Sequence, residues 1–186
     1  WPDNNISSNV KVWADLEFSP SCTAILVVDK NHKIYVWCLE REKEILIAQA
    51  AIHYRGQAFN RESTAFSRDS KLLAIISGEH EVQIWSLDKA ECIWSHREDT
   101  FVLMGVLFSP DCSRIAAISD DQDLRIWDTS TSECFSTLSG WGKSIGNAQF
   151  SPIPDYVVSS SLDSINSSRA DSDLRIWGLK TGGSVS

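Results

Sequence analysis

Short apolar runs separated by polar residues set the pattern of this chain. Examples are Leu72–Ile76, Arg114–Ile118 and Leu124–Trp127. Each run holds about five residues and is bounded by Ser, Asp, Asn or Gly, which is typical of β-strands joined by tight turns. No segment keeps a helical period over three turns, and the nearest, 39–51, contains an apolar run at 45–47 that favours a strand. The pattern therefore predicts an all-β fold.

Two short sequence marks recur along the chain. The first is a Phe-Ser pair, with its phenylalanines at Phe18, Phe66, Phe108 and Phe150. The second is a tryptophan preceded by Val or Ile, at Trp37, Trp85, Trp127 and Trp177. The phenylalanines lie 48, 42 and 42 residues apart, and the Phe-to-Trp interval is 19 in the first three units and 27 in the fourth, which carries an eight-residue insertion. A fixed interval found three times predicts one supersecondary unit copied along the chain.

Each unit is predicted to form a four-stranded antiparallel sheet. The first strand ends at Phe-Ser, the second is the apolar run, the third ends at the tryptophan, and the fourth is weaker. Because the inner strands carry apolar residues on both faces, each sheet must be covered on both sides. Four-stranded sheets packed face to face around an axis make a β-propeller. The predicted blades cover residues 10–50, 58–96, 100–139 and 143–186.

The units resemble WD repeats, most clearly from Phe108-Ser-Pro-Asp-Cys-Ser to Leu124-Arg-Ile-Trp-Asp128, and the period fits that family. The resemblance implies a WD-repeat β-propeller in which the four repeat tryptophans are buried and Asp121 and Asp171 are the turn aspartates. The sequences of Phe66–Ala74 and Asp128–Cys134 are also similar to the repeats at the C-terminal end of fungal NACHT–WD proteins. Those are signalling NTPases of heterokaryon incompatibility and innate recognition.

The chain departs from the WD pattern at two sets of positions. The Gly-His pair of the family stands nine residues before the Phe mark, where this chain has Asn9, Gln57, Asp99 and Trp141. The turn aspartate stands six residues before the Trp mark, where this chain has Asn31, Glu79, Asp121 and Asp171. The histidine-centred network that braces many WD blades is therefore not expected in its usual shape. His32 and His80, five residues before their tryptophans, are expected to be solvated loop residues.

The fourth unit ends at 181–186, near the point where its last strand should begin. The last blade is therefore predicted to lack most of its final strand. We expect the chain to be part of a larger propeller, or to close by borrowing a strand from residues 1–9. A bare strand edge pairs readily with other chains, so the isolated chain is expected to oligomerise or aggregate.

Charge and composition narrow the classes of partner. The 186 residues carry a formal charge of −8, from 17 Lys and Arg against 25 Asp and Glu. An acidic surface repels phosphate, so no nucleic-acid partner is expected. The sequence has no run of 18 apolar residues, so no membrane partner is expected, and without a signal peptide the expected location is cytoplasmic. Five cysteines without a CxxC pair argue against a disulfide framework or a zinc site.

The candidate motifs for chemistry are weak. Gly142-Lys143-Ser144 resembles the end of a phosphate-binding loop, but Thr137 stands where the pattern needs its first glycine. Asp163, Asp171 and Asp173 lack the glycine and terminal Glu of a calcium loop. No catalytic residue, cofactor or metal is therefore predicted. The cysteines follow the repeat: Cys22 and Cys112 replace a turn glycine, and the periodic placement of Cys92 and Cys134 predicts packing.

Aromatic residues at strand entrances supply the candidate binding site. Phe59 and Phe101 both stand seven residues before their Phe mark. Trp141 lies in the loop that leads into the first strand of the fourth unit, with Lys143 nearby. In propellers these entrances ring one mouth of the central channel, and exposed aromatics beside charge are typical of binding hot spots. We therefore hypothesise a partner-binding rim at these four residues; the alternative is that the rings pad the channel. Trp94, in a fourth strand, is expected to be exposed.

These expectations favour a non-catalytic module that binds other proteins or peptides. It would serve as a protein–protein interaction scaffold or as the recognition module of a larger signalling protein, with an NTPase domain in the same longer chain. One alternative is a degenerate or truncated propeller remnant without independent function. A propeller enzyme is less favoured, because no Ser/His/Asp or His/carboxylate group emerges from the repeat.

Overall fold

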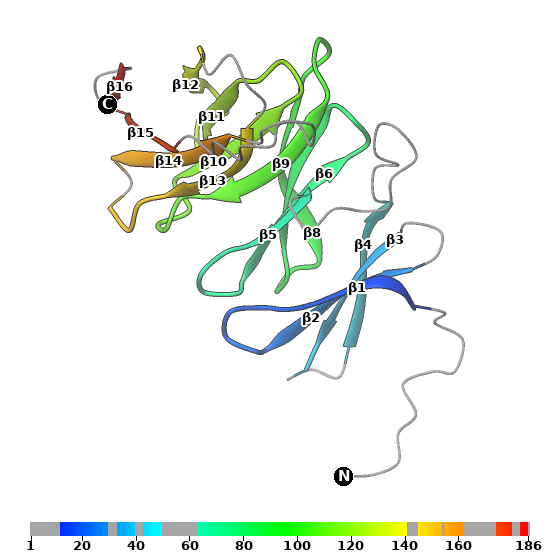
Figure 1. Ribbon diagram of the computed structural model, residues 1–186. Coiled ribbons are helices and arrows are strands. Elements are labelled where there is room, and N and C mark those ends of the chain that lie inside the picture. The colour runs from blue at the N-terminus through cyan, green and yellow to red at the C-terminus, as the bar shows by residue number, and fades with distance from the viewer. Residues whose placement is uncertain are drawn as a thin grey trace, which may run out of the picture.

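A computed structural model describes residues 12–29, 33–39, 43–49, 63–140, 145–153, 155–161, 174–179 and 183–185. Within these ranges the chain forms sixteen β-strands in four four-stranded sheets. Figure 1 shows the four sheets following one another in chain order, from blue to red. In the part of the chain that the structure describes, no helix is long and apolar enough to cross a membrane.

The sheets are named blades 1 to 4 in chain order. Blade 1 comprises β1 (Val12–Phe18), β2 (Ala24–Asp29), β3 (Lys33–Cys38) and β4 (Lys43–Gln49). Blade 2 comprises β5 (Thr64–Phe66), β6 (Leu72–Ser77), β7 (Glu81–Ser86) and β8 (Glu91–Arg97). Blade 3 comprises β9 (Leu103–Phe108), β10 (Arg114–Ser119), β11 (Leu124–Asp128) and β12 (Cys134–Leu138). Blade 4 comprises β13 (Ile145–Phe150), β14 (Tyr156–Ser161), β15 (Leu174–Gly178) and β16 (Gly183–Val185).

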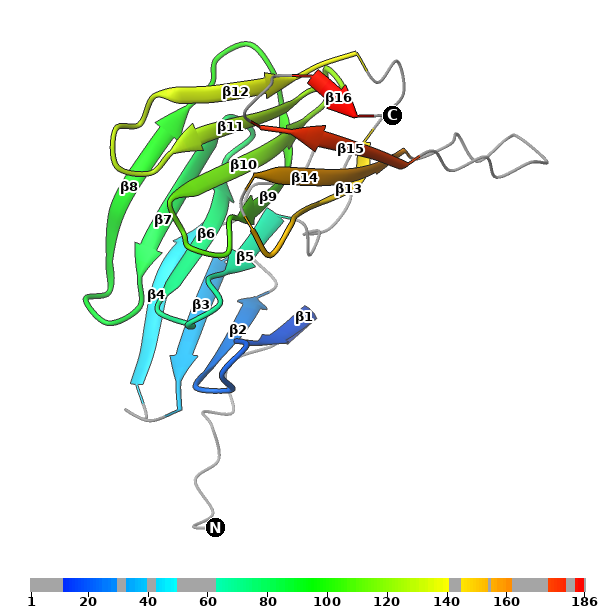
Figure 2. The same ribbon diagram turned by 90° about the vertical axis from the view of Figure 1, so that its left-hand side faces the viewer.

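Every blade is an antiparallel meander in which each strand pairs with the next one along the chain. Figure 2 shows blade 1 and blade 4 at opposite ends of the stack, so the propeller is not closed. The prediction of an all-β propeller built from four four-stranded blades is confirmed. The final strand of blade 4, β16, has three residues and pairs with β15 through Ile176, Trp177 and Gly178.

The middle strands explain why the blades stack. In β6, Leu73 and Ile75 belong to the apolar cluster shared with blade 1, whereas Ala74 and Ile76 belong to the cluster shared with blade 3. Successive side chains of a strand point to opposite faces. A strand that is apolar at both parities must therefore be covered by a neighbour on each side. The same alternation in β10 joins blade 3 to blades 2 and 4.

A repeated serine turn connects the first two strands in blades 1 to 3. In blade 3, the Ser109 backbone N–H donates to the Arg114 carbonyl at 3.0 Å and the Ser109 hydroxyl donates to Asp111 at 2.7 Å. Cys22 and Cys112 close this turn with φ angles of 57° and 59°, a left-handed conformation that glycine adopts without strain. The geometry agrees with their predicted role as substitutes for a turn glycine. Ser70 holds the same place in blade 2, with φ 59°.

The expectation of packing is wrong for the two other periodic cysteines, Cys92 and Cys134. Both are exposed, on the outer strands β8 and β12. The outer strand of a blade has no further strand beyond it, so side chains near its free edge reach solvent even where the repeat places them periodically.

Candidate interaction surface

A short loop that joins blade 2 to blade 3 is the centre of the candidate surface. It runs from Glu98 to Val102, between β8 and β9, and carries Phe101, one of the predicted rim residues. The Glu98 backbone N–H donates to the His80 carbonyl at 2.7 Å. At the other end, the Val102 N–H donates to the Asp120 carboxylate at 3.0 Å and the Asp120 N–H returns to the Val102 carbonyl at 2.9 Å. Turns from both blades therefore hold the loop.

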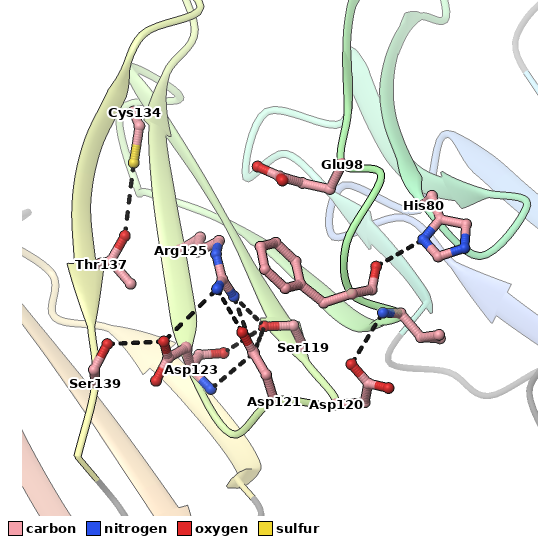
Figure 3. Close-up of polar contacts among 12 residues, drawn as sticks. His80, Glu98, Ser119, Asp120, Asp121, Asp123, Arg125, Cys134, Thr137 and Ser139 are labelled. Carbon is pink, nitrogen blue, oxygen red and sulfur yellow. Dashed lines mark hydrogen bonds and ion pairs between the residues drawn. The ribbon is translucent and has the colours of Figure 1, made fainter.

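His80 adds a side-chain contact to this loop. Its Nδ1 lies 2.7 Å from the carbonyl oxygen of Phe101, and its ring is half-buried (Figure 3). The expectation that His80 is a solvated loop residue is therefore wrong. The turn that carries His80 contacts the loop that leads from blade 2 to blade 3, and the position of His80 within its own unit did not reveal this neighbour.

Arg125 of β11 holds the side chain of Phe101. Its guanidinium carbon lies 3.5 Å from the centre of the Phe101 ring, which is cation–π geometry. The same guanidinium makes two hydrogen bonds to Asp121, at 2.5 and 3.0 Å, and one to the Ser119 hydroxyl at 2.5 Å (Figure 3). A carboxylate oxygen of Asp123 lies 3.7 Å away. Phe101 is thus anchored by a residue that is itself fixed by bidentate pairing.

Arg125 and Asp121 each stabilise the ionised form of the other. The Arg125 hydrogen bond, opposed by burial and aided by the Ser119 hydroxyl, holds the pKa of the Asp121 carboxyl below its ordinary value. Burial by itself would lower the pKa of the Arg125 guanidinium, but its hydrogen bond to Asp121 and the charges of Asp121, Asp123 and Glu98 raise it. Both groups therefore stay ionised, and the pair resists loss of either charge.

The surroundings of Phe101 are acidic. The side chains of Glu79 and Asp99 are 42% and 80% exposed, and Asp120 is exposed as well. The charge of Arg125 is balanced by the carboxylates of Asp121 and Asp123. Arg97 forms an ion pair with Asp99 at 2.9 Å, and both side chains are exposed to solvent. The loop therefore presents a half-buried aromatic ring within a negatively charged border.

The structure places the other predicted residues unevenly. Phe59, Trp141, Lys143 and Asp171 lie outside the described residues, so the predicted rim is described only at Phe101. Among the repeat tryptophans, Trp127 and Trp177 are buried, whereas Trp37 and Trp85 are half-buried. Asp121 occupies the turn position that the resemblance implied, and there it bonds Ser119 and Arg125.

The indole N–H groups of Trp177 and Trp85 donate hydrogen bonds to different kinds of acceptor. The Trp177 indole N–H donates to the Ser159 hydroxyl at 2.8 Å in the buried interior of blade 4. The Trp85 indole donates to Gln83 at 3.0 Å, and Gln83 in turn donates to Glu81 at 3.1 Å. The blades therefore use local polar residues where the histidine of the WD pattern is missing.

His96 braces Trp127, and the sequence analysis missed it. Its ring centre lies 4.9 Å from that of Trp127 and 6.1 Å from that of Trp94, and its Nε2 lies 3.1 Å from Glu98. The position expected for a histidine holds Asp99, three residues further along. Trp94 is only 9% exposed, so the expectation that it is exposed is wrong. A histidine two residues after a tryptophan in the outer strand was the available signal, since both side chains then share one face.

The described residues of this surface do not form a metal-binding group. Among the described residues, no group of three or more His, Cys, Asp or Glu side chains is arranged to hold a metal ion. The side chains of His80, Glu98, Asp99 and Asp120 bond neighbouring side chains or backbone atoms, which is an arrangement that stabilises a surface and orients it for contact.

One protein-family model and one solved structure are similar to this chain. Residues 90–128 match the family model described as "WD domain, G-beta repeat". A solved structure, described as the structure of U3-55K, superposes with a TM-score of 0.67 and 17% sequence identity over 91% of this chain. The match covers 50% of the U3-55K chain, so this chain spans about half its length. No curated protein sequence matches this chain. The four sheets are therefore similar to WD-repeat propeller blades, and the propeller that they form is not closed.

Proposed function

We propose that this chain is a non-catalytic protein-binding module whose contact surface is the Glu98–Val102 loop with the turns that hold it. The cation–π contact between Phe101 and Arg125 carries the proposal. It fixes an aromatic ring at the seam of two blades, and fixed aromatic residues lose little conformational entropy on binding. WD-repeat domains typically bind other proteins, which supports the same function.

The charge of the surface defines the partner we propose. Asp99 lies in the loop, and Glu79 and Asp120 lie in the turns that are hydrogen-bonded to its end, so the loop has a negative border. A peptide segment with Lys or Arg beside an apolar side chain complements both features, because charge complementarity speeds encounter and selects among partners. The proposed partner is therefore a basic-apolar segment of another protein.

The test is selection of peptides from a displayed random library with the purified chain as bait. Enriched peptides are then synthesised, and their affinities are measured by fluorescence anisotropy. We expect basic-apolar peptides, with Asp99→Lys or Glu79→Lys weakening binding at least about fivefold. Glu133→Lys is the matched control, since Glu133 is exposed in the turn at the other end of β11. Equal weakening by Glu133→Lys, or no enrichment, would contradict the proposal and favour a remnant without independent function.

The similarity of Phe66–Ala74 to the repeats of fungal NACHT–WD proteins supports a finer proposal. In it, the chain is the recognition module of a longer cytoplasmic signalling protein that also contains an NTPase domain. Sequencing the transcript on both sides of this chain tests it. An in-frame Gly-x-x-x-x-Gly-Lys-Ser/Thr motif upstream would support the signalling protein, and three further repeats without that motif would contradict it.

A further inference from the structure

Each blade has two apolar faces with distinct partners. The leading face of a blade is the one turned toward the preceding blade, and the trailing face is turned toward the following blade. Between blades 3 and 4, the trailing face of Ala116, Ile118 and Ile126 meets the leading face of Val157 and Trp177. The two other contacts use the same repeat positions. The structure thus contains three copies of one trailing-to-leading interface.

Blade 4 carries a trailing face that this interface does not cover. The register of β14 and β15 pairs Val158 with Ile176 and Ser160 with Leu174 on that face. Leu174 and Ile176 are 66% and 41% exposed. The residues at the same repeat positions in blade 3 are Leu124 and Ile126, and they are 2% and 0% exposed.

Blade 1 carries the complementary uncovered face. Phe18 pairs with Ile25, and Leu16 with Val27, so these side chains share the leading face. Leu16 and Phe18 are 56% and 60% exposed. Phe150 holds the same repeat position in blade 4 and is 6% exposed, because blade 3 covers it.

We propose that the trailing face of blade 4 docks on the leading face of blade 1 in a second copy of this chain. The two faces suit each other because each has the chemistry of a face that is already buried in the three internal contacts. Figures 1 and 2 show them at opposite ends of the molecule, so one copy does not bring its own two faces together. A head-to-tail contact repeated twice closes a ring, and two copies supply eight blades, within the range known for propellers.

Sedimentation of the purified 186-residue chain in an analytical ultracentrifuge measures the association. We expect a closed dimer. Leu174→Asp/Ile176→Asp removes the trailing face, and Leu16→Asp/Phe18→Asp removes the leading face. Every contact needs one face of each kind, so each variant should be monomeric, with dimerisation weakened at least about 100-fold. An equimolar mixture of the two variants should form a 1:1 heterodimer through the single intact pair of faces.

Controls separate this contact from other modes of association. Ile93→Asp changes a side chain of β8 that is 47% exposed and should leave the dimer intact. Far-UV circular dichroism checks the fold of every variant, and Leu174→Ser/Ile176→Thr replaces the charged pair if it fails to fold.

Four results would overturn the proposal. These are a monomeric wild-type chain, an open series of larger oligomers, dimers that survive loss of the trailing face, and a mixture that stays monomeric. Dimers that survive loss of both faces would point instead to pairing of strand edges.

Discussion

The guanidinium carbon of Arg125 lies 3.5 Å from the ring centre of Phe101. Arg125 is on β11 of blade 3, whereas Phe101 lies in the loop that joins blade 2 to blade 3. Asp121 holds the other side of the guanidinium in a bidentate pair. The contact converts a loop aromatic into a fixed part of the surface. It also links the stability of blade 3 to the shape of the proposed binding site.

Arg125→Met is expected to lower the free energy of unfolding by about 1 kcal/mol, because the partly exposed Asp121 carboxylate and the buried Ser119 hydroxyl then lose their charged donor. Urea denaturation followed by tryptophan fluorescence measures the change. A cycle with Phe101→Leu isolates the cation–π contact, for which we expect a coupling of about 0.5–1 kcal/mol. Additive effects of the two substitutions would show that the ring and the guanidinium do not interact energetically.

The stability of the protein is expected to fall in acid partly through Asp121. The Arg125 hydrogen bond places its pKa below the ordinary 3.8, so the folded state holds its proton less tightly than the unfolded chain does. This contribution to stability is present above pH 3.8 and is lost as pH falls through the lowered pKa. Asp121→Asn should therefore reduce the loss of stability on acidification below about pH 5.

Urea denaturation at a series of pH values measures this effect. In Asp121→Asn, the slope of the free energy of unfolding against pH should be reduced rather than abolished. Hydrogen bonds also lower the pKa values of Asp69, Asp111 and Asp128, which remain in the variant. Identical slopes for the wild type and Asp121→Asn would assign the acid sensitivity to the other carboxyls.

Ser159→Ala is expected to destabilise blade 4 by about 1–3 kcal/mol, because the buried Trp177 indole N–H then loses its acceptor at 2.8 Å. The matched control is Ser160→Ala, on the opposite face of β14, which should change the free energy of unfolding by less than about 0.5 kcal/mol. Urea midpoints of both variants provide the comparison. Equal effects would mean that the hydroxyl of Ser159 contributes nothing beyond its volume.

The left-handed turn residue Cys22 offers a route to a more stable protein. Its φ of 57° is unfavourable for a residue with a Cβ atom, and its side chain is exposed. Cys22→Gly should raise the free energy of unfolding by up to about 1 kcal/mol, whereas Cys22→Val should lower it by a similar amount. Cys22→Asn should fall between them, since Asn tolerates this conformation. Thermal melts rank the three variants, and Val above Gly would refute the role assigned to the turn.

Local pattern was enough to predict the strands and the fold class. Short apolar runs such as Leu72–Ser77, bounded by polar turn residues, indicate strands, and the repeated Phe and Trp marks indicate one unit copied in chain order. Both signals depend only on neighbours along the chain. The left-handed turn at Cys112 was predictable for the same reason, since its place in the repeat belongs to a glycine.

The candidate site was predicted in part. Phe101 was placed at a strand entrance by its distance from Phe108, and the structure finds it in the loop before β9. Its contact with Arg125 was not predictable, because Arg125 lies on a separate strand, β11, which only the folding of blade 3 brings to the loop. The same limit explains the wrong expectation for Trp94, whose burial depends on packing against the neighbouring blade.

The sequence by itself determined which side chains alternate between the two faces of each blade. Leu124 and Leu174 hold the same repeat position and have the same chemistry, yet one is 2% and the other 66% exposed. Only the tertiary structure decided this difference. Alternation is a property of the local backbone, whereas burial requires a second surface, and that surface comes from a different blade.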